Sequence, residues 1–291
     1  MENRVFYLVD VFAEERYSGN QLAVVESFGT LSDLQMQKIA NEMHFSETAF
    51  LLSDLKENGG YDVRIFTPSK ELPFAGHPTL GTAYVIKQRI GNENLKTVVL
   101  NLKVGQITVD FANNNGTKEI AWMKQLSPSF GKIYESSEFA KLLNLTEKDI
   151  HSFPIQEVST GLPFIIVPIK TLDAVKRSRV DPQLENAKKI QAGILVFCPE
   201  TYNKENDLNV RVFANAYGIS EDPATGSANG CLAGYLSHYK YFGGSKVDAR
   251  VEQGFEIGRP SLIHLKVEKK LGQTQVFVGG KVVMVAKGEF L

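Results

Sequence analysis

Two stretches of the chain share one order of apolar and polar positions. In the first, Arg64-Ile65-Phe66 leads through a loop to Ala75-Gly76-His77-Pro78 and then to an apolar run. In the second, Arg211-Val212-Phe213 leads through a loop to Thr225-Gly226-Ser227-Ala228 and to another apolar run. Alternation that gives way to a glycine and a continuous apolar run predicts a strand, a turn and a helix start. We therefore interpret the chain as two related halves.

The pattern elsewhere predicts further strands and helices, in a loosely repeated order. Strands are predicted at residues 5–12, 22–25, 47–52, 63–66, 97–111, 164–167, 193–197, 211–213 and 261–285. Helices are predicted at residues 31–43 with Ser32 or Thr30 as N-cap, 77–89 before Gly91, 137–143, 182–191 with Asp181 as N-cap, and 227–239.

The helices that follow the two glycine turns lack a polar face over most of their length. A helix that is apolar around most of its circumference is buried, and repeated glycine in it indicates close backbone packing. We therefore predict an α+β protein of two similar domains, each a curved, mostly antiparallel sheet or barrel wrapped around a central helix. The alternative is two ordinary α+β sandwiches.

A polar segment separates the halves. Residues 111–119 contain Asn113-Asn114-Asn115-Gly116, which predicts a turn. We place the boundary there, with an N-terminal half at residues 1–116 and a C-terminal half at residues 117–291. A strand at the C-terminus can cross back to the first half.

Composition narrows the function classes. The 291 residues are 43% hydrophobic, and 32 basic residues against 33 acidic ones leave a net charge of −1. Scattered charge without a basic stripe argues against a nucleic-acid partner, and no apolar run is long enough to span a membrane. The N-terminus lacks a signal-peptide layout and two cysteines suggest no disulfide framework, so we expect a cytoplasmic protein.

No motif points to a metal or a bound cofactor. The five histidines lack metal-ligand spacing, and neither a Walker loop nor a Gly-x-Gly-x-x-Gly turn after a strand is present. The two helix starts suggest a different ligand. The first N–H groups of a helix lack partners and lie at its positive end, so Gly76 and Gly226 predict binding of a small carboxylate.

Glu47 is the candidate acid/base group. Phe45, Ala49 and Phe50 flank it, and desolvation by such neighbours raises a carboxyl pKa toward neutrality. The alternative is an exposed glutamate at a strand edge. The corresponding stretch of the second half, near Gln191-Ala192-Gly193, carries no acid.

The other polar residues at the turns fit either a structural or a functional role. His77 at a helix start favours the neutral imidazole, which could bind substrate, shuttle a proton or support the turn. Asp222 precedes a proline and fits a turn or cap, or a ligand contact; Ser227 could cap the helix or donate to a ligand. Arg64 and Arg211 could bind anions, but their matched positions favour structural ion pairs.

Several of these motifs, in this order, resemble the PhzF family of phenazine-biosynthesis-like isomerases over nearly the whole chain. They are Ser46-Glu47-Thr48-Ala49-Phe50, Phe66-Thr67-Pro68, Ala75-Gly76-His77-Pro78-Thr79, Ser159-Thr160-Gly161-Leu162-Pro163, residues 221–228, and Val9-Asp10-Val11-Phe12 with Gly19-Asn20.

The resemblance implies a fold similar to that of diaminopimelate epimerase and proline racemase, with the active site between the halves. It implies that Glu47 is the catalytic acid/base and that His77, Asp222 and Ser227 support it. Gly76 and Gly226 would offer N–H groups to a substrate carboxylate. It also implies a homodimer without a cofactor.

Ala75 and Thr225 align with the two thiols of the related racemases, and neither is a thiolate base. This favours a proton shift within a small carboxylate, expected to be cyclic, through one carboxyl group, as in the dihydro-hydroxyanthranilate isomerisation of the family's namesake. The alternatives are an epimerase or racemase of an amino or hydroxy acid, with His77 as second group, and a non-catalytic metabolite-binding protein. The substrate itself stays open.

Overall fold

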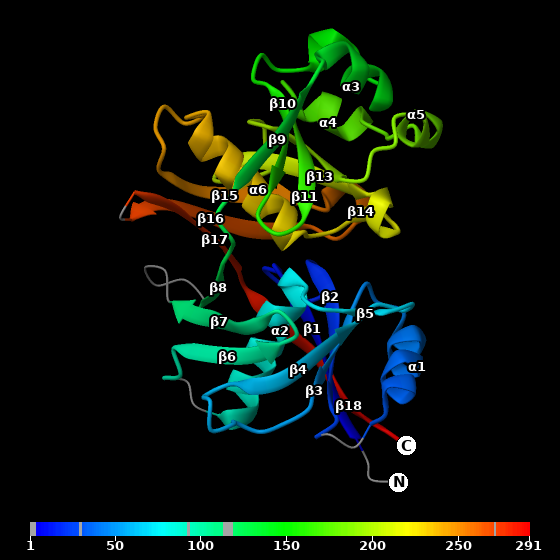
Figure 1. Ribbon diagram of the computed structural model, residues 1–291, viewed down its shortest axis with the longest axis vertical. Helices are drawn as coiled ribbons and strands as arrows, with labels where there is room; N and C mark the ends of the chain where they lie inside the picture. Colours follow the sequence, from blue (N-terminus) through cyan, green and yellow to red (C-terminus); the bar gives the residue numbers. More distant parts are fainter. Residues whose placement is uncertain (1–3, 29–30, 92–93, 113–118, 271) are drawn as a thin grey trace. The chain divides into compact units, whose positions relative to one another are not determined.

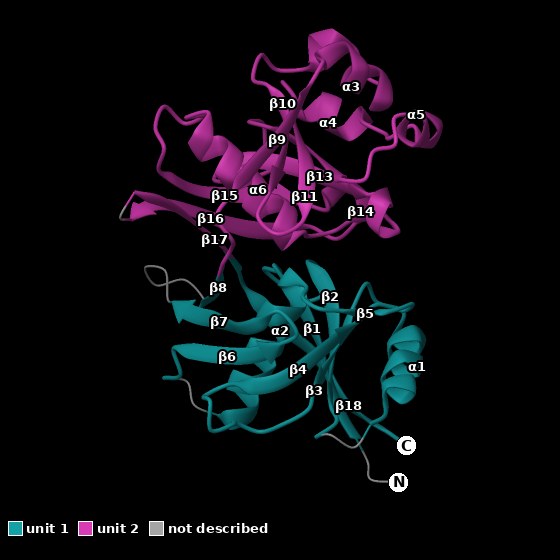
Figure 2. Cartoon of the chain, in the orientation of Figure 1, with its two compact units in different colours: residues 1–123, 279–291 teal, residues 124–278 magenta. Residues whose placement is uncertain are grey.

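The computed structural model describes residues 4–28, 31–91, 94–112, 119–270 and 272–291. The chain divides into two compact units (Figure 2): unit 1 comprises Met1–Met123 with Gly279–Leu291, and unit 2 comprises Lys124–Val278. The turn predicted at residues 113–116, and with it the boundary expected after residue 116, lies outside the described residues.

Unit 1 is built on one curved sheet (Figure 1). Antiparallel pairs join β18 to β1, β1 to β2, β3 to β4, β6 to β7 and β7 to β8, and parallel pairs join β2 to β3 and β4 to β6. The strands are β1 (Arg4–Val11), β2 (Asn20–Glu26), β3 (Thr48–Leu51), β4 (Tyr61–Phe66), β5 (Glu71–Leu72, paired with β4), β6 (Thr97–Leu102), β7 (Gly105–Ala112), β8 (Ile120–Lys124) and β18 (Val282–Phe290).

The sheet of unit 1 wraps around α2 (Gly76–Ile90), which packs against β1, β2, β3, β6, β7 and β18. A Cβ at Gly81 would lie 2.5 Å from Leu22 and 2.9 Å from Val11, so glycine allows the helix to approach the strands this closely. Gly91 ends the helix in the left-handed conformation at φ 67°. α1 (Asp33–Met43) lies outside the sheet, and a capping box of Ser32 and Gln35 starts it.

Unit 2 repeats this pairing. Antiparallel pairs join β9 to β10, β10 to β11, β12 to β13 and β15 to β16, and parallel pairs join β11 to β12 and β13 to β15. The strands are β9 (Ser129–Tyr134), β10 (Ile155–Ser159), β11 (Pro163–Pro168), β12 (Gly193–Cys198), β13 (Leu208–Ala214), β14 (Ile219–Asp222, paired with β13), β15 (Val247–Gln253), β16 (Ser261–Lys270) and β17 (Gln273–Gly280).

The central helix of unit 2 is α6 (Gly226–His238), which packs against β10, β11, β12, β15 and β16. Its side chains are buried on every face, and a Cβ at Gly234 would lie 2.7 Å from Pro128. The other helical segments are α3 (Ser136–Leu142), α4 (Leu172–Arg177), α5 (Pro182–Ala187), η1 (Glu147–Asp149), η2 (Asn215–Tyr217) and η3 (Phe255–Ile257).

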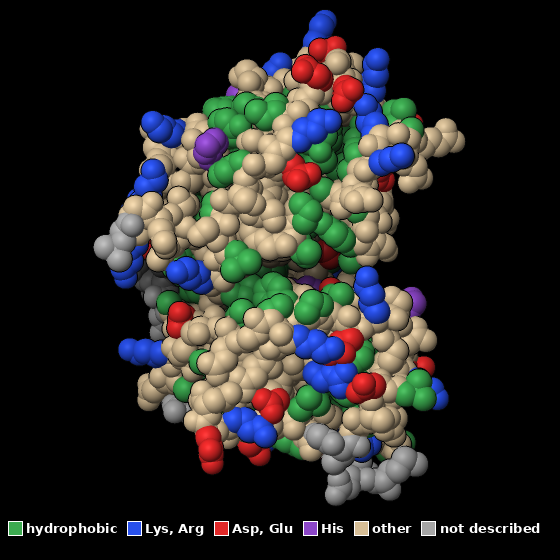
Figure 3. All heavy atoms as spheres, viewed as in Figure 1, with side chains coloured by type: hydrophobic (Ala, Val, Ile, Leu, Met, Phe, Trp, Pro, Cys, Tyr) green, Lys and Arg blue, Asp and Glu red, His purple; other side chains and the backbone are tan. Residues whose placement is uncertain are grey.

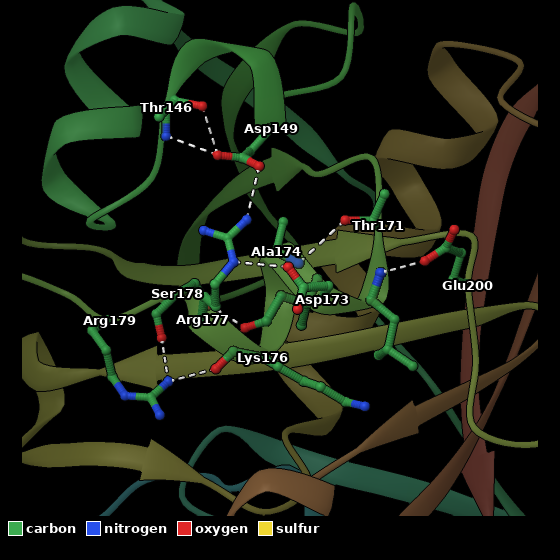
Figure 4. A network of polar contacts seen from close by, with 12 residues as sticks. Thr146, Asp149, Thr171, Asp173, Ala174, Lys176, Arg177, Ser178, Arg179 and Glu200 are labelled. Carbon is green, nitrogen blue, oxygen red and sulfur yellow. Dashed lines mark hydrogen bonds and ion pairs between the residues drawn. The ribbon is translucent and has the colours of Figure 1, made fainter.

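Polar contacts fix α4 beside the sheet of unit 2 (Figure 4). Thr171 caps the helix by accepting a hydrogen bond from the Ala174 N–H, and Glu200 accepts one from the Leu172 N–H. At the other end, Arg177 donates to Asp173 and Asp149. The carbonyls at the carboxyl end of α4 accept hydrogen bonds from Arg211 of β13.

The prediction of two similar domains, each wrapped around a central helix, is confirmed, and the sandwich alternative is wrong because α2 and α6 are buried on all sides. The helix predicted at residues 182–191 ends earlier, at Ala187, and Lys189 adopts a positive φ of 52°. The short helix α4 was not predicted, because its buried side chains, Ala174 and Val175, give too little periodicity.

Candidate active site

The start of α2 in unit 1 is open to an anion. Its N-cap is Ala75, which has no side-chain group to bond the helix N–H groups, and Pro78 has no N–H. The Thr79 hydroxyl turns back to the Ala75 carbonyl at 2.7 Å. Within the described residues, the N–H groups of Gly76 and His77 therefore have no acceptor, and such donors at the positive end of a helix suit a carboxylate.

Glu47 lies directly before β3, and its carboxyl group faces the start of α2. Its Oε2 is 3.5 Å from Nε2 of His77, and the two side chains are 12% and 8% exposed. The interpretation of Glu47 as an exposed strand-edge residue is therefore wrong. The low exposure of the Glu47 side chain agrees with the partial desolvation that the sequence pattern predicted.

His77 is neutral. Burial lowers the pKa of its imidazole to about 3, although a hydrogen bond to the backbone carbonyl of Gln21 opposes that shift. Nε2 has no hydrogen-bond partner among the described residues, so the other ring nitrogen holds the proton that binds Gln21. Nε2 thus presents a lone pair to Glu47, and it can accept a hydrogen bond from the protonated form of that carboxyl group.

The start of α6 in unit 2 is open in the same way. Its N-cap, Thr225, makes no side-chain capping bond, and the N–H groups of Gly226, Ser227 and Ala228 have no acceptor within the described residues. The Thr225 hydroxyl instead donates to Oδ2 of Asp222. Asp222 is therefore part of a turn that also leaves the helix donors uncovered.

Ser227 is the second residue of α6, so the alternative in which it caps the helix is wrong. Its carbonyl accepts a hydrogen bond from the buried Thr160 at 3.5 Å. A role of its hydroxyl toward a ligand stays a prediction.

The matched arginines form structural ion pairs, as their positions predicted. Arg64 donates twice to Glu71, at 2.7 Å each, and to Asp33 at 2.6 Å. Arg211 donates twice to Glu221, at 2.8 and 2.7 Å, and to the carbonyls of Val175, Lys176 and Ser178 at the end of α4. All three nitrogens of each guanidinium group thus make hydrogen bonds within their own unit, which favours the structural role over substrate binding.

Strand register explains why only one half carries an acid. Arg64 pairs with Phe50 of β3, and the matching Arg211 pairs with Val196 of β12. Glu47 and Gly193 each lie three residues before these partners, so they occupy equivalent positions in the two units. A Cβ at Gly193 would lie 2.4 Å from the ring of Phe164. The aromatic ring therefore fills the space next to the backbone where the second half would need a carboxyl side chain.

Two-thiol chemistry has no basis here. Ala75 and Thr225, the positions aligned with the racemase thiols, are the N-caps of α2 and α6. Burial raises the pKa of the Cys231 thiol to about 11 and that of Cys198 to about 12. Both cysteines are buried parts of the core of unit 2.

The sequence did not single out Gln253. This side chain is fully buried on β15 and bonds Thr225, Asp222 and Asn229. The only available signal was a pair of polar residues, Glu252 and Gln253, at the end of an otherwise alternating strand. Two adjacent polar residues are common in sequences. Only the tertiary structure, in which β15 pairs with β13 and Gln253 bonds Thr225, shows what this pair contacts.

The described part of the chain gives little support for a metal site, a membrane span or a strongly charged binding surface. There, no three His, Cys, Asp or Glu side chains are grouped to hold a metal ion. None of the helices described is both long enough and apolar enough to cross a membrane. Basic and acidic side chains are interspersed on the face seen in Figure 3.

Comparison with known proteins places the chain in a family. The family model described as phenazine biosynthesis-like protein matches residues 9–288. The chain is 34% identical over 286 residues to the trans-2,3-dihydro-3-hydroxyanthranilate isomerase of Pseudomonas fluorescens, covering 97% of this chain and 98% of that one. It is 32% identical over 299 residues to an uncharacterized isomerase of Mesorhizobium japonicum, covering 99% of each.

Solved structures agree. A PhzF-family phenazine biosynthesis protein of Bacillus anthracis superimposes with a TM-score of 0.91 at 30% identity, over 100% of both chains. A hydroxyproline epimerase of Agrobacterium vitis, 9% identical, shares the fold with a TM-score of 0.62 over 100% of this chain and 91% of that one. Two related units, each with a sheet around a central helix, thus define a fold used by epimerases and isomerases. The chain belongs to the PhzF family, and it is an isomerase.

Proposed function

We propose that this isomerase moves a proton within a small, cyclic, carboxylate-bearing substrate, with Glu47 as the only acid/base group and without a cofactor. The Glu47–His77 pair carries this proposal, because it is a nearly buried carboxyl group beside a neutral imidazole. A carboxylate can take a proton from one carbon, and the carboxylic acid that results can give a proton to another carbon. One residue therefore serves both steps of an allylic shift.

His77 supports the acid form of Glu47 in this mechanism. Its tautomer is fixed by the hydrogen bond to the Gln21 carbonyl, so Nε2 accepts a hydrogen bond from the protonated carboxyl group. Nε2 accepts this hydrogen bond once the Glu47 carboxylate has taken a proton from one carbon of the substrate. The hydrogen bond breaks when Glu47 gives the proton to the second carbon, and Glu47 returns to the carboxylate form.

The open helix starts are the proposed binding groups. The N–H groups of Gly76 in unit 1 and of Gly226 in unit 2 suit a carboxylate, and Asp222 and Ser227 are the proposed polar contacts of the substrate. Fixed N–H donors stabilise negative charge that spreads from a conjugated system into a carboxylate during proton transfer. The expectation that both helix starts serve one substrate stays a prediction.

The name of the Pseudomonas fluorescens relative supplies the first substrate to test, trans-2,3-dihydro-3-hydroxyanthranilate. The purified isomerase is incubated with it in D₂O, and the double-bond positions are followed by NMR. We expect migration of a double bond, with deuterium at the newly protonated carbon where Glu47 exchanges with solvent before transfer. Related cyclic unsaturated carboxylates are tested in parallel, because the proposed binding groups recognise a carboxylate and do not select a particular ring.

Two other outcomes would overturn the proposal. Inversion at a single carbon would identify an epimerase, and tight binding without reaction across the substrate panel would identify a metabolite-binding protein. The epimerase alternative needs two groups on opposite faces of one carbon. His77 fits this poorly, because its Nε2 lies 3.5 Å from Glu47 and burial keeps its pKa near 3.

The family resemblance also implies a homodimer, which we propose as the working form. Sedimentation equilibrium tests it directly, with a mass twice that of the chain as the expected result. A monomer at concentrations that support turnover would overturn it.

A further inference from the structure

Thr225 occupies the N-cap of α6 but does not cap it. An N-cap threonine ordinarily accepts a hydrogen bond from an N–H group of the first turn. Here the hydroxyl hydrogen goes to Oδ2 of Asp222, and no first-turn N–H reaches the hydroxyl oxygen. The consequence is an uncovered set of N–H groups and a fixed carboxylate, both at the proposed substrate-binding end of the helix.

Gln253 explains this orientation. Its Nε2 donates to the Thr225 hydroxyl oxygen at 3.1 Å and to the Asp222 carbonyl at 2.7 Å. Its Oε1 accepts from the Thr225 N–H at 3.2 Å and from Nδ2 of Asn229 at 2.8 Å. Because the amide donates to the threonine oxygen, the hydroxyl hydrogen of Thr225 is directed to the other side, onto Asp222.

The other unit shows that the fold does not need this network. Parallel pairing aligns Tyr61 with Leu100 in unit 1, and Leu208 with Val251 in unit 2. Leu102 lies two residues after Leu100, and Gln253 lies two residues after Val251, so Leu102 is the residue of unit 1 that corresponds to Gln253. Ala75, the N-cap of α2, corresponds to Thr225, the N-cap of α6. Unit 1 thus forms its helix start with apolar residues at both of these positions, so the repeated architecture does not by itself account for the polar pair in unit 2.

We propose that Gln253 is a positioning residue, which draws the Thr225 hydroxyl away from capping α6 and onto Asp222. It thereby keeps the N–H groups of Gly226, Ser227 and Ala228 open to an anion and holds the Asp222 carboxylate in one orientation. The inference rests on the proposed function, because it assigns these groups to the substrate, but its consequence for anion binding is measurable without turnover.

The test uses the full chain and two variants. Gln253→Leu frees the threonine hydroxyl to turn back and cover the helix donors. The double variant Thr225→Ala/Gln253→Leu reproduces the pair found in unit 1, with no hydroxyl left to cap. Benzoate is the probe, benzamide is its uncharged control, and the amide resonances of residues 226–228 are followed in ¹H–¹⁵N spectra.

We expect benzoate, and not benzamide, to shift these amides in the unsubstituted protein. In Gln253→Leu the benzoate affinity falls at least fivefold, and in the double variant it returns to within twofold. Turnover stays low in both variants, because the Thr225 hydroxyl no longer donates to Asp222. Recovery of binding in the doubly substituted chain separates positioning from a merely structural role, since the second substitution restores no lost packing.

The outcomes distinguish the inference from the proposed function. Unchanged benzoate binding in Gln253→Leu, equal losses in both variants, or no benzoate response in the unsubstituted protein would overturn the positioning role. Lack of turnover in the unsubstituted protein, together with the expected pattern of benzoate binding, would count against the proposed function alone. Gln106→Leu, on the exposed part of β7, controls for the substitution itself.

Discussion

The Oε2 atom of Glu47 lies 3.5 Å from Nε2 of His77, and the imidazole beside it is held neutral by burial. This relationship places a proton-donating and proton-accepting carboxyl group at the open start of α2. In the proposed mechanism, both groups lie on one side of the substrate. The arrangement suits repeated use of one acid/base group more than inversion between two.

Glu47→Gln should abolish turnover while leaving the fold intact. The amide keeps the size of the side chain but cannot exchange a proton, and loss of a general acid/base typically costs about 10²–10⁴-fold in rate. Turnover of the dihydro-hydroxyanthranilate and the thermal unfolding midpoint are measured together. Glu42→Gln, on the exposed surface of α1, is the matched control. A Glu47→Gln variant that keeps more than a tenth of the original rate would contradict the mechanism.

The His77 pKa predicts a pH-dependent part of the stability. Its folded pKa of about 3 lies below the ordinary value of 6.5, so the unfolded chain binds the proton more tightly. The stabilisation is complete above pH 6.5 and is lost as the pH falls toward 3, which amounts to about 5 kcal/mol.

Urea unfolding of the unsubstituted protein and of His77→Gln across that pH range measures this contribution. Glutamine does not titrate, so the difference in unfolding free energy between the two proteins should shrink as the pH falls. A difference that is constant from pH 6.5 to 3 would show that the His77 pKa is not lowered in the folded protein.

Arg211→Ala should destabilise unit 2 strongly. The guanidinium is nearly buried against Glu221 and three carbonyls, and removal of one partner of a buried pair costs about 3–5 kcal/mol. Arg177→Ala, which removes the exposed ion pairs of α4, should cost about 0–1 kcal/mol. Equal losses in chemical denaturation would contradict the structural assignment of Arg211.

Gly193→Glu should not create a second acid/base group. The new side chain meets the ring of Phe164, and overpacking of this kind costs about 1–3 kcal/mol. We expect a lower unfolding midpoint and no rescue of activity when Gly193→Glu is combined with Glu47→Gln. A second substitution, Phe164→Leu, should recover part of the stability because it removes the ring. Restored turnover in either combination would show that the two halves are chemically interchangeable.

Ala75→Ser should stabilise the protein and impair binding. A serine N-cap can accept the hydrogen bond of the His77 N–H, which stabilises a helix by about 0.5–1 kcal/mol. The same bond occupies a donor proposed for the substrate, so KM for the dihydro-hydroxyanthranilate should rise severalfold. Thr171→Ala, which removes the existing cap of α4, is the control and should lower stability without changing KM. An Ala75→Ser variant that is stabilised but has an unchanged KM would place the substrate elsewhere.

Local patterns predicted most of the elements and part of the site. Glycine turns before continuous apolar runs located α2 and α6, and matched Arg-x-Phe strands indicated both the duplication and the ion pairs. They missed Gln253, because its partners Thr225 and Asp222 lie about thirty residues away along the chain. They also assigned Ser227 a possible capping role, since the N-cap can be fixed only to within a residue or two from sequence.

By itself the sequence determined the two-part α+β fold, the two helix starts and the identity of the one acid beside an apolar stretch. These depend on periodicity, glycine turns and local burial, which act between residues close in the chain. Only the tertiary structure decided that Glu47 meets His77, that Phe164 occupies the matching place in unit 2, and that Gln253 turns the Thr225 hydroxyl onto Asp222. Strand register helps to bring those partners together, and a shift of register by one residue would move the side chains of Phe164 and Gln253 to the opposite faces of their strands.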